Sequence, residues 1–193
     1  IIVLNVYNER LLRLLAETQI PKVFLDTSSL VSPDELNGDL LLMESRNSVR
    51  NITAHLLEKG CTLPGFMGDI GYAQSNRERY EGFCQALMDA GKTPNPSLCL
   101  TTPLGIDSYR EEIDSFLSSL SRMPDAFVCA SDYVACILMQ LLEKRGLRVP
   151  EDVAVSGFDN NIEDLLAENL TTVQVFNEEL GSRLALQILY RIK

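Results

Sequence analysis

A carboxylate and an amide follow a short apolar run near the end of the chain. Val153, Ala154 and Val155 form this run without polar alternation, which is typical of a parallel strand covered on both faces. Asp159 and Asn160 come next, so we expect them beyond the carboxyl end of that strand. Open α/β sheets bind ligands in the crevice outside those ends. A carboxylate there can accept two hydrogen bonds, which suits a polyol or a heterocycle that donates them.

Polar side chains end two other predicted strands in the same way. Asp26 follows residues 23–25, and Ser131 follows residues 126–130. Each also has a structural explanation, because Asp side chains stabilise turns and Ser side chains cap helices. An Asx-turn is the same kind of alternative for Asp159. The residue types alone leave both roles open.

Arg79 lies in the first turn of a helix predicted over residues 76–90. Its planar guanidinium carries five donors in a fork that suits ligand oxygens. The structural alternative is a solvated ion pair with Glu78 or Glu81.

Residues for catalysis or metal binding are sparse. His55 is the only histidine, and no Ser or Cys is placed to use it as a base. The five cysteines contain no C-x-x-C, which favours buried reduced thiols over a zinc site. Glycines 65, 68 and 71 lack the spacing and the Lys-Ser/Thr of a phosphate loop. We therefore predict no catalysis, no cofactor and no metal, with a doubly wound enzyme as a remaining alternative class.

Short apolar runs alternate with amphipathic stretches along the chain, which predicts an α/β fold of parallel sheets wound by right-handed crossovers. Predicted strands cover residues 1–6, 22–25, 40–43, 63–67, 98–101 and 126–130. Predicted helices cover residues 8–18, 47–59, 76–90, 107–121 and 132–144.

The net charge is −10, so this chain would repel phosphates and is not expected to contact DNA itself. No apolar run reaches the roughly 18 residues of a membrane span. Residues 1–6 lack the basic start and the cleavage site of a signal peptide. We expect a cytoplasmic protein without a membrane partner.

Four segments together resemble the effector-binding core of the lactose-repressor/galactose-repressor family of bacterial transcription regulators. They are residues 146–160, residues 124–132, the Arg-x-x-Gly-aromatic helix of residues 79–87, and residues 170–173 followed by Glu179-Leu180-Gly181. The resemblance implies a fold like that of type I periplasmic binding proteins, with two lobes of parallel sheet flanked by helices.

The family's layout also implies a domain organisation. Residues 1–43 and 174–193 would be the remaining part of an incomplete N-terminal lobe, and residues 44–173 the C-terminal lobe. A helix-turn-helix head and earlier strands would precede this chain in a longer protein, and a final strand would follow it.

The same resemblance assigns ligand-binding positions. The matching residues are Asp26, Ser75, Arg79, Ser131, Asp159 and Phe176. Many family members have Asn where this chain has Ser131, and this departure leaves the ligand class open.

The predicted helix over residues 132–144 is apolar almost all round. One face must pack on the sheet, and another helix or a partner subunit must cover the rest. The family dimerises partly through this helix, so we expect a homodimer with Cys136 and Met139 at the interface.

The resemblance thus implies the effector-sensing domain of a bacterial transcriptional regulator, most often a repressor. A small polar ligand, in particular a sugar, would bind between the lobes and shift the affinity of the missing head domain for operator DNA. The alternative is a stand-alone sugar-binding protein of a transport system, which shares the two-lobed fold.

Overall fold

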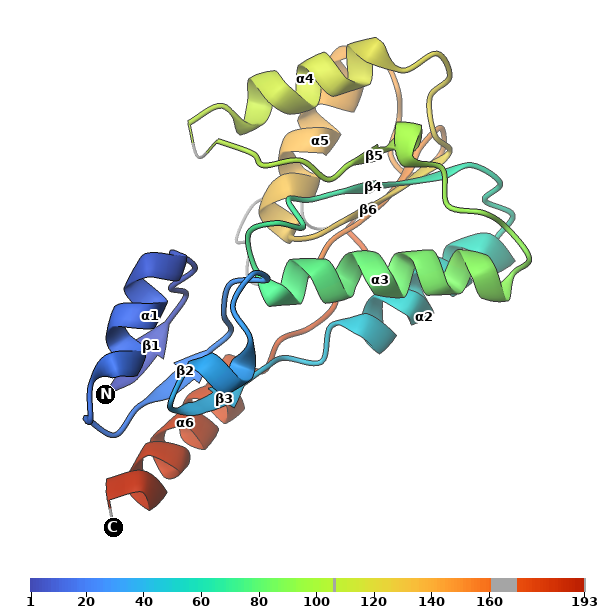
Figure 1. The fold of residues 1–193 in the computed structure, drawn as a ribbon. Coiled ribbons are helices and arrows are strands. Elements are labelled where there is room, and N and C mark those ends of the chain that lie inside the picture. Colours follow the sequence, from blue (N-terminus) through green and yellow to red (C-terminus); the bar gives the residue numbers. More distant parts are fainter. Residues whose placement is uncertain (106, 161–169, 193) are drawn as a thin grey trace.

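The computed structural model describes residues 1–105, 107–160 and 170–192 and contains two parallel β-sheets flanked by helices (Figure 1). One sheet has the order β1-β2-β3, with β1 at Ile2–Leu4, β2 at Val23–Leu25 and β3 at Asp39–Leu41. The other has the order β5-β4-β6-β7, with β4 at Pro64–Met67, β5 at Cys99–Leu100, β6 at Ala126–Cys129 and β7 at Ala154–Ser156. All registered strand pairs are parallel, which confirms the predicted α/β class.

The helices divide between the two sheets (Figure 1). The first sheet has α1 at Glu9–Glu17 and α6 at Asn177–Ile192, and we call this group the N-terminal lobe. The second sheet has α2 at Arg46–Glu58, α3 at Gln74–Asp89, α4 at Tyr109–Ser119 and α5 at Asp132–Lys144, and we call it the C-terminal lobe. None of these helices, within the described ranges, is long and apolar enough to cross a bilayer.

Alternating side chains of β6 pack on opposite faces of the C-terminal sheet. Phe127 and Cys129 belong to a core shared with α4 and α5, whereas Val128 belongs to a core shared with α2 and α3. Because both faces are covered, every residue of this strand is buried. Its polar end is thereby fixed at one edge of the sheet.

A close contact between α2 and α3 explains the glycine of the Arg-x-x-Gly segment. A Cβ at Gly82 would lie 2.1 Å from the carbonyl oxygen of Arg46. No side chain fits there, so the two helices approach closely and α3 holds Arg79, one turn earlier, against the sheet.

Helix α5 corrects the predicted subunit interface. Cys136 and Met139 are 6% and 7% exposed within the single chain, and Met139 shares a core with Ile113 and Leu117 of α4. Met139 is therefore covered by α4, and both side chains are almost fully buried within one chain, which argues against the predicted interface at these residues. The helix instead exposes Tyr133.

The segment expected to cross between the lobes forms bridges in place of a regular strand. Thr171 pairs with Ser156, and Gln174 pairs with Asp159, each as an isolated parallel bridge. The segment thus extends the β7 edge and then leads into α6 of the N-terminal lobe.

Candidate functional site

A cavity of about 420 Å³ lies between the two lobes, at the carboxyl ends of both sheets. From the N-terminal lobe, residues that follow β1, β2 and β3 line it, and from the C-terminal lobe, residues that follow β6 and β7 and residues near the start of α3. We call this cavity the cleft. Its lining includes Asn5, Tyr7, Asp26, Met43, Tyr72, Ser75, Asn76, Arg79, Tyr109, Ser131, Asp159, Val175, Asn177 and Leu180.

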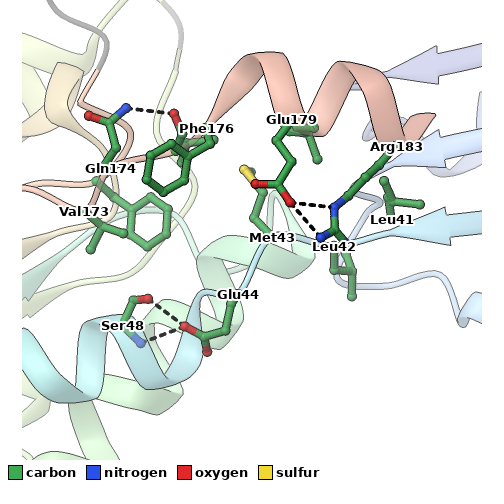
Figure 2. A pocket seen from close by; sticks show the side chains of 13 residues that line it. Leu41, Leu42, Met43, Glu44, Ser48, Val173, Gln174, Phe176, Glu179 and Arg183 are labelled. Atoms are coloured by element: carbon green, nitrogen blue, oxygen red, sulfur yellow. Dashed lines mark hydrogen bonds and ion pairs between the residues drawn. The ribbon is translucent and has the colours of Figure 1, made fainter. Parts of the chain in front are cut away.

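The structure brings the predicted ligand-binding residues together, except for one. Asp26, Ser75, Arg79, Ser131 and Asp159 all line the cleft. Phe176 does not: it is 68% exposed and lines a second cavity, shown in Figure 2. Its neighbours Val175 and Asn177 line the cleft, although Val175 also lines the second cavity and Asn177 is the first residue of α6.

Arg79 is a buried cation on the floor of the cleft, 4% exposed. Its guanidinium lies 3.6 Å from the ring centre of Phe158, and Nη1 donates to the carbonyl oxygen of Ala130. Nη2 is 3.8 Å from Oδ1 of Asp159, while the buried Nε has no hydrogen-bond partner in the described part of the chain. Burial lowers the pKa of Arg79, and the carboxylates of Asp159 and Asp26 oppose that effect. The guanidinium is thus a buried cation whose Nε and Nη2 donors remain available to a ligand.

Asp159 lies in an unusual backbone conformation, with φ at +116°. Burial raises its pKa to about 6, while Arg79 lowers it and Asp132 adds a further rise. Strained backbone at a polar, partly buried residue is typical of a functional site. The Asx-turn considered for Asp159 would involve residues 161–169, which lie outside the described residues.

Asp26 connects the lobes. It is 2% exposed, with φ at +60°. Its Oδ2 accepts from the Ser75 hydroxyl at 2.6 Å, and its Oδ1 accepts from the Thr27 amide at 2.8 Å. The turn-stabilising role considered for Asp26 is therefore present, together with a contact to α3 of the other lobe. A ligand that reaches Asp26 must compete with Ser75.

Ser131 also combines its two predicted roles. Its hydroxyl accepts a hydrogen bond from the Val134 amide at 3.3 Å and so caps α5. The neighbouring Asp132 does not cap; it accepts from the Thr172 hydroxyl at 2.5 Å and holds the crossing segment.

Sequence reasoning missed an aromatic contact across the cleft. The rings of Tyr7 and Tyr72 have centroids 4.4 Å apart, and burial raises the pKa of Tyr7. Tyr7 follows the strand predicted over residues 1–6, so the strand-end rule that selected Asp26 would also have found it. Asn5 lay inside that predicted strand, whereas β1 ends at Leu4. Tyr72 lies in a loop before α3, and no sequence signal indicates its partner. No group of three or more His, Cys, Asp or Glu residues among those described could hold a metal ion.

Known proteins similar in sequence to this chain include transcriptional regulators. The model of a periplasmic binding protein-like domain matches residues 53–193. The chain is 31% identical to the HTH-type transcriptional repressor PurR of Aliivibrio fischeri, over 96% of this chain and 55% of that protein. It is 30% identical to the HTH-type transcriptional regulator DegA of Bacillus subtilis, over 87% of this chain and 48% of that protein. The chain thus spans about half the length of the curated relatives it matches.

Solved structures resemble the fold as a whole. The transcriptional regulator CelR, in a complex with cellobiose, matches with a TM-score of 0.84 and 26% identity, over 99% of this chain and 58% of that one. A transcriptional regulator of the LacI family from Sanguibacter keddieii matches with a TM-score of 0.77 and 26% identity, over 92% of this chain and 65% of that one.

Proposed function

The chain belongs to the periplasmic binding protein-like domain family, as an effector-binding domain of the lactose/galactose-repressor type, and we propose that it senses a small polar ligand for a DNA-binding regulator. In this proposal the ligand, in particular a sugar, binds in the cleft. The domain acts by binding and performs no catalysis.

The convergence of polar side chains from both lobes on one cavity carries the proposal. Arg79 and Asp159 approach from the C-terminal lobe, and Asp26 and Tyr7 from the N-terminal lobe. The cavity volume falls in the range of small-molecule sites. Carboxylates accept from hydroxyl groups and a guanidinium donates to ring and hydroxyl oxygens, which favours a sugar. The fold also resembles that of the regulator CelR, whose solved structure is a complex with cellobiose.

A ligand in this position acts on the whole protein by selecting a lobe arrangement. We take residues 1–43 with 174–193 as one lobe and residues 44–173 as the other. A ligand that touches both stabilises the arrangement that fits it, and so shifts the DNA affinity of a head domain outside this chain. Repression in the cytoplasm is the proposed role. A homodimer is part of the proposal, through surfaces other than Cys136 and Met139.

A two-part experiment on the full-length protein tests this function. Thermal-shift screening against mono- and disaccharides is expected to find a ligand that raises the melting temperature, because binding to the folded state stabilises it. That ligand should then change the affinity for operator DNA. A ligand that raises the melting temperature of a full-length protein unable to bind DNA supports the transport alternative. Absence of any stabilising small molecule contradicts the sensing role.

A further inference from the structure

A second cavity of about 390 Å³ lies behind the segments that connect the lobes (Figure 2). Its walls are the connector between β3 and α2, the crossing segment after residue 172, and the first turns of α6. We call it the hinge cavity. Its lining is mainly apolar and includes Phe176 and Leu42, which are 68% and 39% exposed. The proposed effector site does not use these side chains.

The hinge cavity and the cleft share a wall. Met43, Val175 and Leu180 line both cavities. Phe158 lines the hinge cavity, and its ring also carries the Arg79 guanidinium at 3.6 Å. A molecule in the hinge cavity therefore touches the ring on which the cleft cation rests. It also touches the connectors that must bend when the lobes move.

The charges around the hinge cavity are mostly negative. Among the described residues, Glu44 and Glu179 line it together with a single cation, Arg183, which is paired with Glu179 at 2.7 Å. Figure 2 shows that Glu44, which precedes α2, accepts hydrogen bonds from Ser48 in the first turn of that helix. Burial would raise the pKa of Glu44, but hydrogen bonds from Ser48 and Asn47 outweigh it and leave the pKa below its usual range. Glu44 is thus ionised and, among the described residues, has no ion-pair partner.

We propose that the hinge cavity is a second small-molecule site, which takes a compact ligand with an aromatic or aliphatic body and one cationic group. The apolar walls and Phe176 hold the body, and the excess carboxylate at the rim selects the cation. The volume is within the range of ligand sites. Through Phe158 and the shared wall, occupancy alters the affinity of the cleft for its effector. This coupling rests on the proposed function, whereas the site itself does not.

Methionine-methyl NMR of the full-length protein, combined with variants, tests the site. Met43 lines both cavities, so its methyl reports a probe in either one and the variants described next decide which; the exposed Met88 of α3 provides a reference signal. A Met43→Leu variant assigns the signal. We expect 2-phenylethylammonium to shift the Met43 methyl saturably and to leave Met88 unchanged. Neutral 2-phenylethanol should bind more weakly, and anionic 3-phenylpropionate most weakly.

Variants of Phe176, which directly precedes α6, and of Glu179 on α6 separate the two cavities. Phe176→Ala should weaken the probe by about tenfold through lost apolar contact. Glu179→Gln should weaken it by about two- to fivefold, the scale of an exposed ion pair. The matched controls Leu186→Ala and Glu178→Gln change exposed residues of α6 outside the cavity and should have no effect.

Three outcomes would overturn the site. They are no saturable shift of Met43, equal or tighter binding of the anion, and a shift that is lost in Asp159→Asn but kept in Phe176→Ala. The last outcome places the probe in the cleft. For the coupling, saturating probe should change the affinity for the effector found by screening, and the effector should change probe affinity by the same factor. Two unchanged affinities would refute the coupling and leave both sites standing.

Discussion

At the residue scale, the site depends on two opposite charges that do not fully satisfy each other. Nη2 of Arg79 and Oδ1 of Asp159 are 3.8 Å apart, too far for a good hydrogen bond. Burial opposes ionisation of both groups, which raises the pKa of Asp159 and lowers that of Arg79. Each group therefore keeps hydrogen-bonding capacity for a ligand that lies between them.

The pKa of Asp159 predicts a pH dependence of stability. It is about 6 in the folded protein against an ordinary value of 3.8. Between these values the folded state binds the extra proton, so the free energy of unfolding should fall as pH rises from about 4 to about 6. In Asp159→Asn this fall should be smaller by about 1–2 kcal/mol. Urea unfolding across this range measures it.

Asp152→Asn is the matched control. Hydrogen bonds from Arg148 hold the pKa of Asp152 at about 2, so its contribution to stability is lost below the range tested and with the opposite sign. The control should retain the slope of the parent protein. An Asp159→Asn protein with that same slope would contradict the assignment.

Sequence reasoning located residues of the cleft where position along a strand determines position in space. Asp26, Ser131 and Asp159 each follow a strand, and all three line the cleft. Phe176 lines the other cavity because it lies where the crossing segment turns into α6, and no strand pattern fixes the direction of its side chain there. The contact of Asp26 with Ser75 joins two lobes, and no local pattern encodes such a contact.

At the element scale, the structure depends on how closely the helices pack. Two packing contacts hold the C-terminal-lobe side of the cleft in place. They are the α2–α3 contact at Gly82 and the burial of α5 under α4. The long helices were predicted to within a few residues because their apolar periodicity is strong. The packing of α4 over α5 could not be predicted, because a helix that is apolar all round does not reveal whether a neighbouring helix or a second subunit buries it.

Gly82→Ala should destabilise the protein. The added Cβ would lie 2.1 Å from the backbone oxygen of Arg46, and overpacking outweighs the better helix propensity of alanine, for a net cost of about 1–2 kcal/mol. The matched control is Gly181→Ala on α6, where an added Cβ meets nothing within 4 Å and should stabilise by up to about 1 kcal/mol. Chemical denaturation measures the free energy of unfolding of both variants. The same change in both would refute the packing argument.

Met139→Lys should unfold the domain rather than dissociate a dimer. The side chain is 7% exposed within one chain, so a charge there is buried without a partner at a cost of about 3 kcal/mol or more. Tyr133→Lys on the same helix is the control, because Tyr133 is 58% exposed. Urea unfolding and sizing distinguish the outcomes. If the parent protein is a dimer and Met139→Lys is a stable, folded monomer, the predicted interface at Met139 would stand after all.

At the scale of the whole molecule, two sheets meet with the carboxyl ends of their strands around one cleft. The alternation of apolar and amphipathic segments predicted the sheets, and the four motif segments predicted the two-lobed arrangement. The contacts between the lobes, such as the Tyr7–Tyr72 pair, lie between loops distant in sequence and could not be predicted.

This chain alone should not bind DNA. Its net charge is −10, and phosphate contacts require clustered Lys and Arg. A mobility-shift assay with operator DNA should show no complex at micromolar concentration. A complex that weakens steeply with salt would contradict the assignment of DNA binding to a separate head domain.

The dissociation constant of the effector found by screening tests the central claim most directly. Calorimetry on the full-length protein compares the parent with Asp159→Ala and with the control Asp152→Ala, which removes a carboxylate that pairs with Arg148 away from the cleft. Loss of a hydrogen bond to a charged group costs about 1.5–3 kcal/mol, so Asp159→Ala should bind about ten- to a hundredfold more weakly. The control should bind like the parent. An unchanged dissociation constant in Asp159→Ala would remove the effector from the cleft.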